Sequence, residues 1–151
     1  MSRTEQVILT NMCMITDGQR VLVQDRKSEK WPGITFPGGH IEPNESLVAS
    51  VIREIKEETG LTVSNLELCG IQNWTDPTDD YRYLVFCYKT SHFSGSIQSS
   101  DEGDVFWIDR ADLKTVPLAD GFETMLEIFE QPQLTENFYW FEDGEWKMEN
   151  R

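Results

Sequence analysis

Three glutamates share one face of the strongest helical pattern in the chain. Residues 45–59 have the apolar spacing of an amphipathic helix. At about 100° per residue, Glu54, Glu57 and Glu58 fall within one sector about 100° wide, and Glu58 reaches the edge of the apolar stripe. Burial of an unpaired carboxylate is costly, so a cation, an arginine or protonation must compensate. Arg53 can neutralise one acid, and a hard divalent cation such as Mg²⁺ suits the remainder.

The alternative is an ordinary, exposed acidic helix face, and the surrounding residues decide between the two. From residue 39 to residue 61 the sequence reads GHIEPNESLVASVIREIKEETGL. This segment resembles the signature of the Nudix hydrolases: Gly, five residues, Glu, seven residues, then Arg-Glu-apolar-x-Glu-Glu-x-Gly-apolar. Its fixed positions are filled by Gly39, Glu45, Arg53, Glu54, Ile55, Glu57, Glu58, Gly60 and Leu61. We call residues 39–61 the box.

The resemblance extends more loosely over residues 7–129, and the loop before the box is similar to that of the MutT-like branch. It implies an enzyme of the α/β class with a Nudix α/β/α sandwich around a central mixed β-sheet. The implied reaction is Mg²⁺- or Mn²⁺-dependent hydrolysis of a nucleoside diphosphate linked to another moiety. The implied metal ligands are the Gly38 carbonyl, Glu54, Glu57 and Glu58. The residues implied to orient them are Gly39, Glu45 and Arg53.

Glu102 lies outside the box, in an acidic loop with Asp101 and Asp104. Asp101 and Asp104 are expected to be ordinary solvent-exposed residues of this loop. The MutT-like resemblance implies that Glu102 faces the metal cluster from the opposite wall. There a carboxylate could ligate a second metal or take a proton from the attacking water. Glu102 is therefore expected to be a catalytic residue. The other expected catalytic residues are Arg53, Glu54 and Glu57.

The MutT-like resemblance favours one substrate class, oxidised purine nucleoside triphosphates. An example is 8-oxo-dGTP, hydrolysed to its monophosphate and pyrophosphate. The residues expected at the substrate are Asn11, Phe36 and Asp120. Asn11 has an alternative, a hydrogen bond to the backbone at a bulge. Asp120 is also suited to cap a helix over residues 121–130.

Two other functions stay open. Pro77 lies near the place where ADP-ribose hydrolases of the family often have a proline, although its TDPTDD context is typical of a plain turn. ADP-ribose or ADP-sugar hydrolysis is thus the alternative reaction. A non-catalytic nucleotide-sensing module is the alternative of another class, and the intact box argues against it. The aromatic residues Trp74, Tyr81 and Tyr83 fit either base stacking or packing within a sheet.

The charge balance restricts the partners of the chain. Its 151 residues contain 13 basic and 27 acidic side chains, a net charge of −14. Nonspecific binding to a nucleic acid polymer or an anionic membrane needs a basic surface, so a small nucleotide held through a cation is the expected ligand. The N-terminus has no secretory signal, and Cys13, Cys69 and Cys87 suit free thiols, which predicts a cytoplasmic protein. A homodimer is compatible with the sequence.

The elements that must position these residues fit one domain over residues 1–151. Strands are expected at 6–16, 20–25, 66–74, 81–90 and 104–108, with loop and short strand at 31–40. The helix of the box should have Asn44 as N-cap and Gly60 as terminating glycine. A second helix is expected at 121–130. The aromatic tail predicts a hairpin at about 138–148 around Asp143-Gly144.

Overall fold

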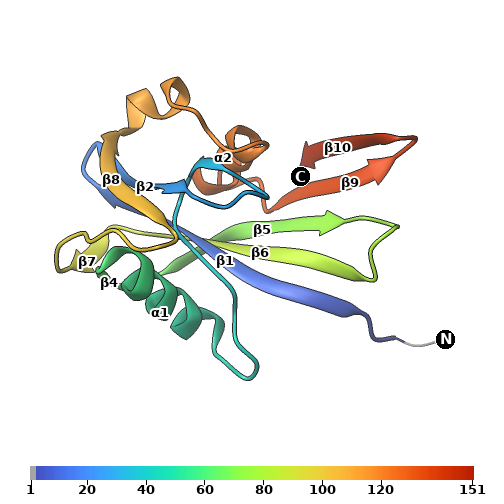
Figure 1. Ribbon diagram of the computed structural model, residues 1–151, viewed down its shortest axis with the longest axis horizontal. Coiled ribbons are helices and arrows are strands. Elements are labelled where there is room, and N and C mark those ends of the chain that lie inside the picture. The colour runs from blue at the N-terminus through green and yellow to red at the C-terminus, as the bar shows by residue number, and fades with distance from the viewer. Residues whose placement is uncertain (1–2) are drawn as a thin grey trace.

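The computed structural model describes residues 3–151 and consists of a mixed β-sheet with one α-helix on each face (Figure 1). The strands before the first helix are β1 (Gln6–Asp17), β2 (Arg20–Arg26) and β3 (Gly33–Thr35). Helix α1 (Leu47–Thr59) is followed by β4 (Thr62–Ser64), β5 (Glu67–Thr75), β6 (Tyr81–Thr90), β7 (His92–Ser94) and β8 (Gly103–Asp109). A 3₁₀ helix (Arg110–Thr115) leads to α2 (Phe122–Glu130), β9 (Glu136–Glu142) and β10 (Glu145–Asn150).

The main sheet has the order β10-β9-β5-β6-β1-β2-β3, with β8 on the other edge of β2. β1 and β6 are parallel, as are β5 and β9, and the remaining pairs of this sheet are antiparallel. β4 and β7 form a separate antiparallel pair. The predicted mixed sheet is therefore confirmed. The sequence pattern did not predict β4 and β7, because three residues are too few to show an alternation.

β1 and β2 diverge, and the box loop lies in the gap between them. β1 pairs with β6 from Gln6 to Ile15 but with β2 only at its last two residues. Along the same stretch, the amides of Asn11 and Cys13 donate to the carbonyls of Gly39 and Pro37 at 2.8 and 2.9 Å. Residues 37–41 are thus held against β1 in nearly strand-like fashion, which brings the start of the box to the centre of the fold.

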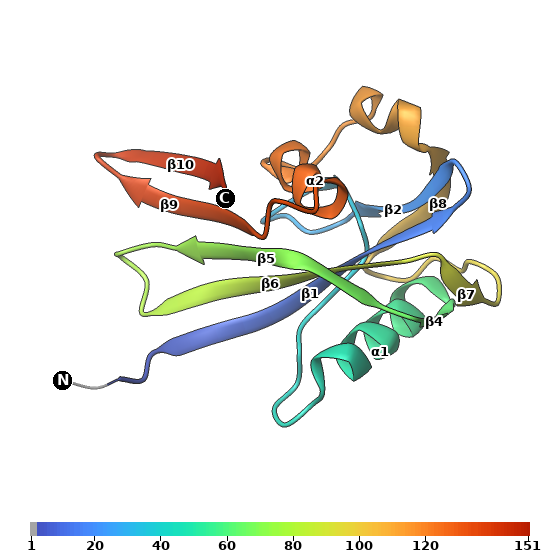
Figure 2. The same cartoon turned by 180° about the vertical axis from the view of Figure 1, so that it is seen from behind.

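Alternate residues of β1 point to the two helical layers. Met12 and Met14 belong to the core beneath α2, whereas Cys13 and Ile15 belong to the core beneath α1. Figure 2 shows the two helices on opposite sides of the sheet. β1 is buried on both faces over residues 10–15. The cysteines are free, and Cys13 and Cys87 are buried.

The N-terminal caps of both helices differ from those predicted. The side chain of Ser46, rather than Asn44, accepts the Ala49 amide at 3.2 Å, so α1 begins two residues later than expected. Asn44 lies in the preceding turn with a φ of 65°. α2 begins after Gly121, which provides no side-chain cap, so the capping role considered for Asp120 is wrong. Gly60 ends α1 with a φ of 81°, as predicted.

The chain ends in a hairpin that extends the main sheet. β9 pairs in parallel with β5, and β10 pairs with β9 along its outer edge (Figure 1). The two strands cover residues 136–150 and are therefore slightly longer than the expected hairpin. Within residues 3–151, no helix is both long enough and apolar enough to cross a bilayer.

Candidate active site

The Arg53 guanidinium joins the start of the box to the face of α1. Its Nε and Nη2 donate to the two carboxylate oxygens of Glu45 at 2.8 and 2.9 Å. Its Nη1 donates to Glu54 at 2.8 Å and to Glu57 at 3.3 Å, and Nη2 also reaches the His40 carbonyl at 3.0 Å. The planar fork of an arginine matches a carboxylate in this bidentate way. The pKa of Glu45 is lowered to about 2, chiefly by the hydrogen bonds from Arg53.

Glu58 is the buried carboxylate of the box. Its side chain faces the protein interior at 7% exposure, and the Gly38 amide donates to it at 3.2 Å. Burial raises the pKa of Glu58 to about 7, and the negative charge of Glu54 adds to that effect. The Gly38 hydrogen bond opposes the rise, and the charge of Glu102 increases it again. Glu58 is thus the carboxylate with the greatest need of a further positive charge.

Gly38 and Gly39 allow the loop to approach both β1 and α1. A Cβ atom on Gly38 would overlap the β1 backbone at Asn11, and one on Gly39 would overlap the Glu54 carboxylate. Larger residues would therefore push the loop out of its place. In strand-like backbone the N–H and C=O of one residue point to the same edge. The Gly38 amide points to Glu58, so its carbonyl faces the same side, where a metal ligand is expected.

Asn11 is a positioning residue rather than a group that is open to a substrate. It is 3% exposed, and its Oδ1 accepts the Gly39 amide at 3.1 Å. Its Nδ2 donates to the Ser50 hydroxyl of α1 at 2.9 Å. The structure therefore favours the backbone-bonding alternative, with the backbone of the box loop as the partner instead of a bulge. Asn11 fixes the distance between that loop and α1.

Phe36 belongs to the core, which corrects the expectation that it contacts the substrate. Its side chain is 1% exposed. The rings of Phe122 and Phe129 from α2 meet it edge-on, each at a centroid distance of 5.0 Å. Position 36 follows β3 directly, and its side chain points toward α2 rather than toward the box. The role of Phe36 is to anchor α2 on the sheet.

The acidic loop before β8 brings Glu102 toward the box. The charge of Glu102 contributes to the raised pKa of Glu58, so the two carboxylates lie within electrostatic range of each other. All three acids of this loop are exposed to solvent, and Asp104 lies 3.9 Å from the Lys27 ammonium. Of the three acids in this loop, Glu102 is the one whose charge reaches Glu58.

Arg26 was not singled out by the sequence pattern, yet it lies between the carboxylates and an aromatic surface. Its Nε donates to the Trp31 carbonyl at 3.1 Å, and its guanidinium lies 5.1 Å from the centre of the Trp31 ring. The positive charge of Arg26 favours ionisation of both Glu58 and Tyr83. A lone Arg at the end of β2 has no spacing signal, because its neighbours come from distant segments.

The aromatic surface begins beside the box loop. The Tyr83 hydroxyl lies 3.5 Å from Nε2 of His40, and the Trp74 ring lies 5.5 Å from the Tyr83 ring. Nearby, Nε1 of Trp31 donates to the Asp120 carbonyl at 2.8 Å, which leaves the exposed Asp120 carboxylate at the end of the loop before α2. Aromatic rings and a carboxylate thus lie within one region beside the box.

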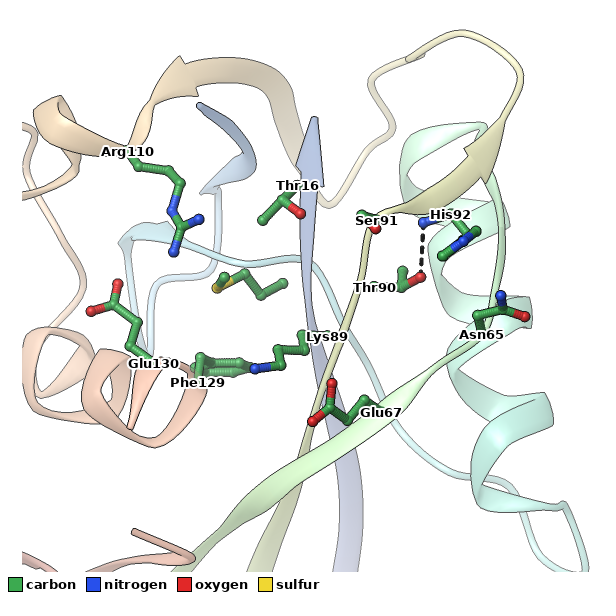
Figure 3. Close-up of a pocket in the computed structure, with 11 residues that line it drawn as sticks. Thr16, Asn65, Glu67, Lys89, Thr90, Ser91, His92, Arg110, Phe129 and Glu130 are labelled. Carbon is green, nitrogen blue, oxygen red and sulfur yellow. Dashed lines mark hydrogen bonds between the residues drawn. The ribbon is translucent and has the colours of Figure 1, made fainter. Parts of the chain in front are cut away.

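A separate hollow of about 480 Å³ lies at the other end of β1 and β6 (Figure 3). Lys89 and Arg110 line it, as do the carboxylates of Glu67 and Glu130. The box loop contacts residues 9–13 of β1, whereas this hollow begins at Met14. Its lining includes none of the box glutamates, so it is not the site that the sequence predicts.

Comparison with known proteins identifies the family. The family model described as the NUDIX domain matches residues 8–145, which includes most of the terminal hairpin. The chain belongs to the Nudix hydrolase family. A Bacillus subtilis relative described as an uncharacterized Nudix hydrolase, YvcI, is 30% identical over 129 residues, which are 83% of this chain and 80% of YvcI.

Two further matches differ in what they cover. The NAD-capped RNA hydrolase NudC of Pseudomonas aeruginosa is 33% identical over 107 residues, 69% of this chain but only 37% of NudC. The MutT structure from Bacillus halodurans aligns with a TM-score of 0.78 at 23% identity, covering 94% of this chain and 97% of that one. The second match shows that the Nudix fold is shared.

The donor set of the box fits the divalent metal ion that Nudix hydrolases generally use. The candidate ligands are all oxygen atoms, which hard divalent cations prefer. Arg53 is occupied by Glu45 and the neighbouring glutamates, and Glu58 is left with one backbone hydrogen bond. As the side chains of residues 3–151 lie, no three His, Cys, Asp or Glu groups converge into a cage. A cation would compensate the buried charge of Glu58, which the Gly38 amide and Arg26 offset only in part.

We predict that Mg²⁺ stabilises this Nudix hydrolase more at pH 8 than at pH 6. Because the folded-state pKa of Glu58 is about 7 instead of its ordinary 4.5, stability without a cation falls as the pH rises from 4.5 through 7. Metal binding requires the ionised form, so saturating Mg²⁺ should raise the Tm at pH 8 by roughly 5–10 °C. Thermal unfolding at both pH values, with and without Mg²⁺, checks this.

Two variants complete this experiment. Glu58→Gln should remove the pH dependence of the Mg²⁺ effect, whereas Glu29→Gln, at an exposed carboxylate away from the box, should retain it. An equal Mg²⁺ shift at both pH values in the wild type and in Glu58→Gln would contradict the assignment of Glu58 as a ligand.

Proposed function

We propose that this Nudix hydrolase cleaves an oxidised purine nucleoside triphosphate, such as 8-oxo-dGTP, to the monophosphate and pyrophosphate. One observation supports this most strongly: the carboxylates of the box adjoin an aromatic surface through Arg26 and His40. The carboxylates suit the phosphates through a metal ion, and the aromatic rings suit the base. Such an enzyme would remove damaged nucleotides before they enter DNA.

The side chains of the box have different tasks in this reaction. Glu54, Glu57 and Glu58, with the Gly38 carbonyl, would hold Mg²⁺ or Mn²⁺. When bound, the ion neutralises phosphate charge and makes the attacking water more acidic. Arg53 keeps two of the glutamates from drifting toward solvent. Glu45 and Asn11 do not touch the reacting atoms, and they fix Arg53 and the loop respectively.

Glu102 would act on the attacking water or ligate a second metal ion. Its carboxylate is close enough to Glu58 to affect that group's pKa, and it comes from a different element, the loop before β8. A base on the far side of the phosphates from α1 could take the proton that water loses on attack. Its backbone carbonyl accepts the Lys27 amide at 3.2 Å, which ties the loop to the end of β2.

Asp120 suits an oxidised purine better than an ordinary one. An ionised carboxylate only accepts hydrogen bonds. A purine oxidised at C8 has an N7–H donor, whereas an ordinary purine has a lone pair at N7 that a carboxylate would repel. Asp120 is exposed, its carbonyl accepts Nε1 of Trp31, and its charge contributes to the raised pKa of Tyr139. This supports a preference for the oxidised base.

A relative's name suggests a second candidate substrate. NudC is named an NAD-capped RNA hydrolase, and NAD, like ADP-ribose, is a nucleoside diphosphate linked to another group. The net charge of −14 disfavours an RNA chain, but it does not affect small dinucleotides held through a cation. NAD and ADP-ribose are therefore the competitors to test.

A substrate panel tests the proposed reaction. With Mg²⁺, we expect a higher kcat/KM for 8-oxo-dGTP than for dGTP, pyrophosphate as the product, and little turnover of ADP-ribose or NAD. Glu57→Gln, as the control, should lower kcat by orders of magnitude with an unchanged circular dichroism spectrum. Preferred turnover of ADP-ribose or NAD would contradict the proposed substrate. Tight nucleotide binding without any turnover would indicate a sensing module.

The role of Glu102 is tested against its neighbour. Glu102→Gln should lower kcat by about 10²–10⁴-fold, the usual contribution of a general base, whereas Asp101→Asn should have little effect. Loss of the acidic limb of the kcat profile would identify a base, and a raised Mg²⁺ requirement would identify a ligand. Equal, small effects of the two substitutions on kcat would show that Glu102 is only a solvent-exposed residue of its loop.

A further inference from the structure

The inner face of the terminal hairpin continues the aromatic surface beside the box. Strand pairing places Tyr83 on β6 opposite Trp74 on β5, and Trp74 opposite Tyr139 on β9. Residues paired in this way point to the same face of a sheet. The Trp74 ring lies 5.5 Å from the Tyr83 ring and 6.2 Å from the Tyr139 ring, and Trp146 stacks on Tyr139 at 4.7 Å. The row therefore runs unbroken from the box loop to β10.

A row of amides lies next to these rings, one step closer to α2. Nε2 of Gln72 donates to Asn137 at 2.9 Å, and Nδ2 of Asn137 donates to Asn150 at 2.8 Å. Asn150 donates in turn to the Thr124 carbonyl at 3.0 Å and to Glu127 at 2.7 Å. Because the last acceptors on α2 cannot donate, every amide of the row has a fixed orientation.

Gln72 is the end of this row that remains available. Asn137 is fully buried, whereas Gln72 is half-buried. Within the part of the chain that the structure describes, the Oε1 atom of Gln72 accepts no hydrogen bond. The row thus holds one carbonyl oxygen in a fixed position beside the rings of Trp74 and Tyr83. An ordered acceptor next to stacked aromatic rings can bind the edge of a planar, N–H-bearing ring.

The hairpin also contacts the loop that presents Asp120. The Met148 side chain lies so close to Gly121 that a Cβ there would be 2.9 Å from it. Burial raises the pKa of Tyr139, and the negative charge of Asp120 adds to the rise, so the two side chains lie within electrostatic range of each other. The hairpin and the loop that carries Asp120 therefore both border the aromatic surface.

We propose that the hairpin forms one wall of the base-binding site, where Tyr139 stacks on the base and Oε1 of Gln72 accepts one of its N–H groups. This proposal rests on the proposed function, which supplies a purine nucleotide as the ligand. Its support is continuity: the row begins at His40, whose carbonyl is bound by Arg53, and it ends on the hairpin. The base would lie along the row while the phosphates lie at the box.

Binding of monophosphates tests the wall without turnover. We expect calorimetry to show that 8-oxo-dGMP binds more tightly than ribose 5-phosphate, which has no base. Tyr139→Ala should weaken 8-oxo-dGMP binding by about 5- to 100-fold, the usual range for loss of one stacking ring, and leave ribose 5-phosphate unchanged. Tyr139→Phe should bind like the wild type. Phe138→Ala is the matched control, because Phe138 stacks on Trp140 at the opposite face of the same strand.

Gln72 is tested by its effect on the base. Gln72→Ala should weaken 8-oxo-dGMP binding and leave ribose 5-phosphate binding unchanged, whereas Asn73→Ala should change neither, since Asn73 contacts Glu136 and Arg82 on the other face. Unchanged nucleotide binding in Tyr139→Ala, or an equal loss in a folded Phe138→Ala, would overturn the proposal even if 8-oxo-dGTP is hydrolysed. If the wild type binds 8-oxo-dGMP more tightly than ribose 5-phosphate and Tyr139→Ala does not, the hairpin wall is supported, even if the substrate panel shows that another nucleotide is hydrolysed.

Discussion

The site depends on one ion-pair cluster, the Arg53 guanidinium between Glu45 and the glutamates of α1. Arg53 spans the loop, through Glu45 and the His40 carbonyl, and the helix, through Glu54 and Glu57. Because the Arg53 guanidinium is hydrogen-bonded to these groups, it does not also neutralise Glu58. The Gly38 amide and the charge of Arg26 offset the burial of Glu58 only in part, so a cation from outside would stabilise its ionised form.

The same loop joins the two halves of the site. It occupies the gap where β1 leaves β2, so the glutamates approach it from the α1 side while the ring of His40 lies by the aromatic surface on the other. A highly acidic protein that acts on an anionic substrate needs this division. A metal ion can carry the attraction for the phosphates, and neutral rings can hold the base without adding charge.

The sequence predicts local features and fails where partners are distant. The spacing of the box glutamates, the end of α1 at Gly60 and the long strands follow from periodicity within short segments. Phe36 was misplaced because nothing local shows that its neighbours would be Phe122 and Phe129. The alignment of Gln72 with Asn137 could not be predicted either, since a parallel pairing across 65 residues leaves no pattern in either segment.

The most direct test of this account is the Mg²⁺ affinity of Glu45→Gln, measured by calorimetry. Glu45 is not among the expected metal ligands, and its carboxylate holds Arg53 and also accepts the Glu42 amide. Loss of an outer partner that orients metal ligands commonly costs about 10–100-fold in metal affinity, and we expect a loss of that size in a folded protein. An unchanged Mg²⁺ affinity would show that the arginine cluster does not organise the site and would contradict the account.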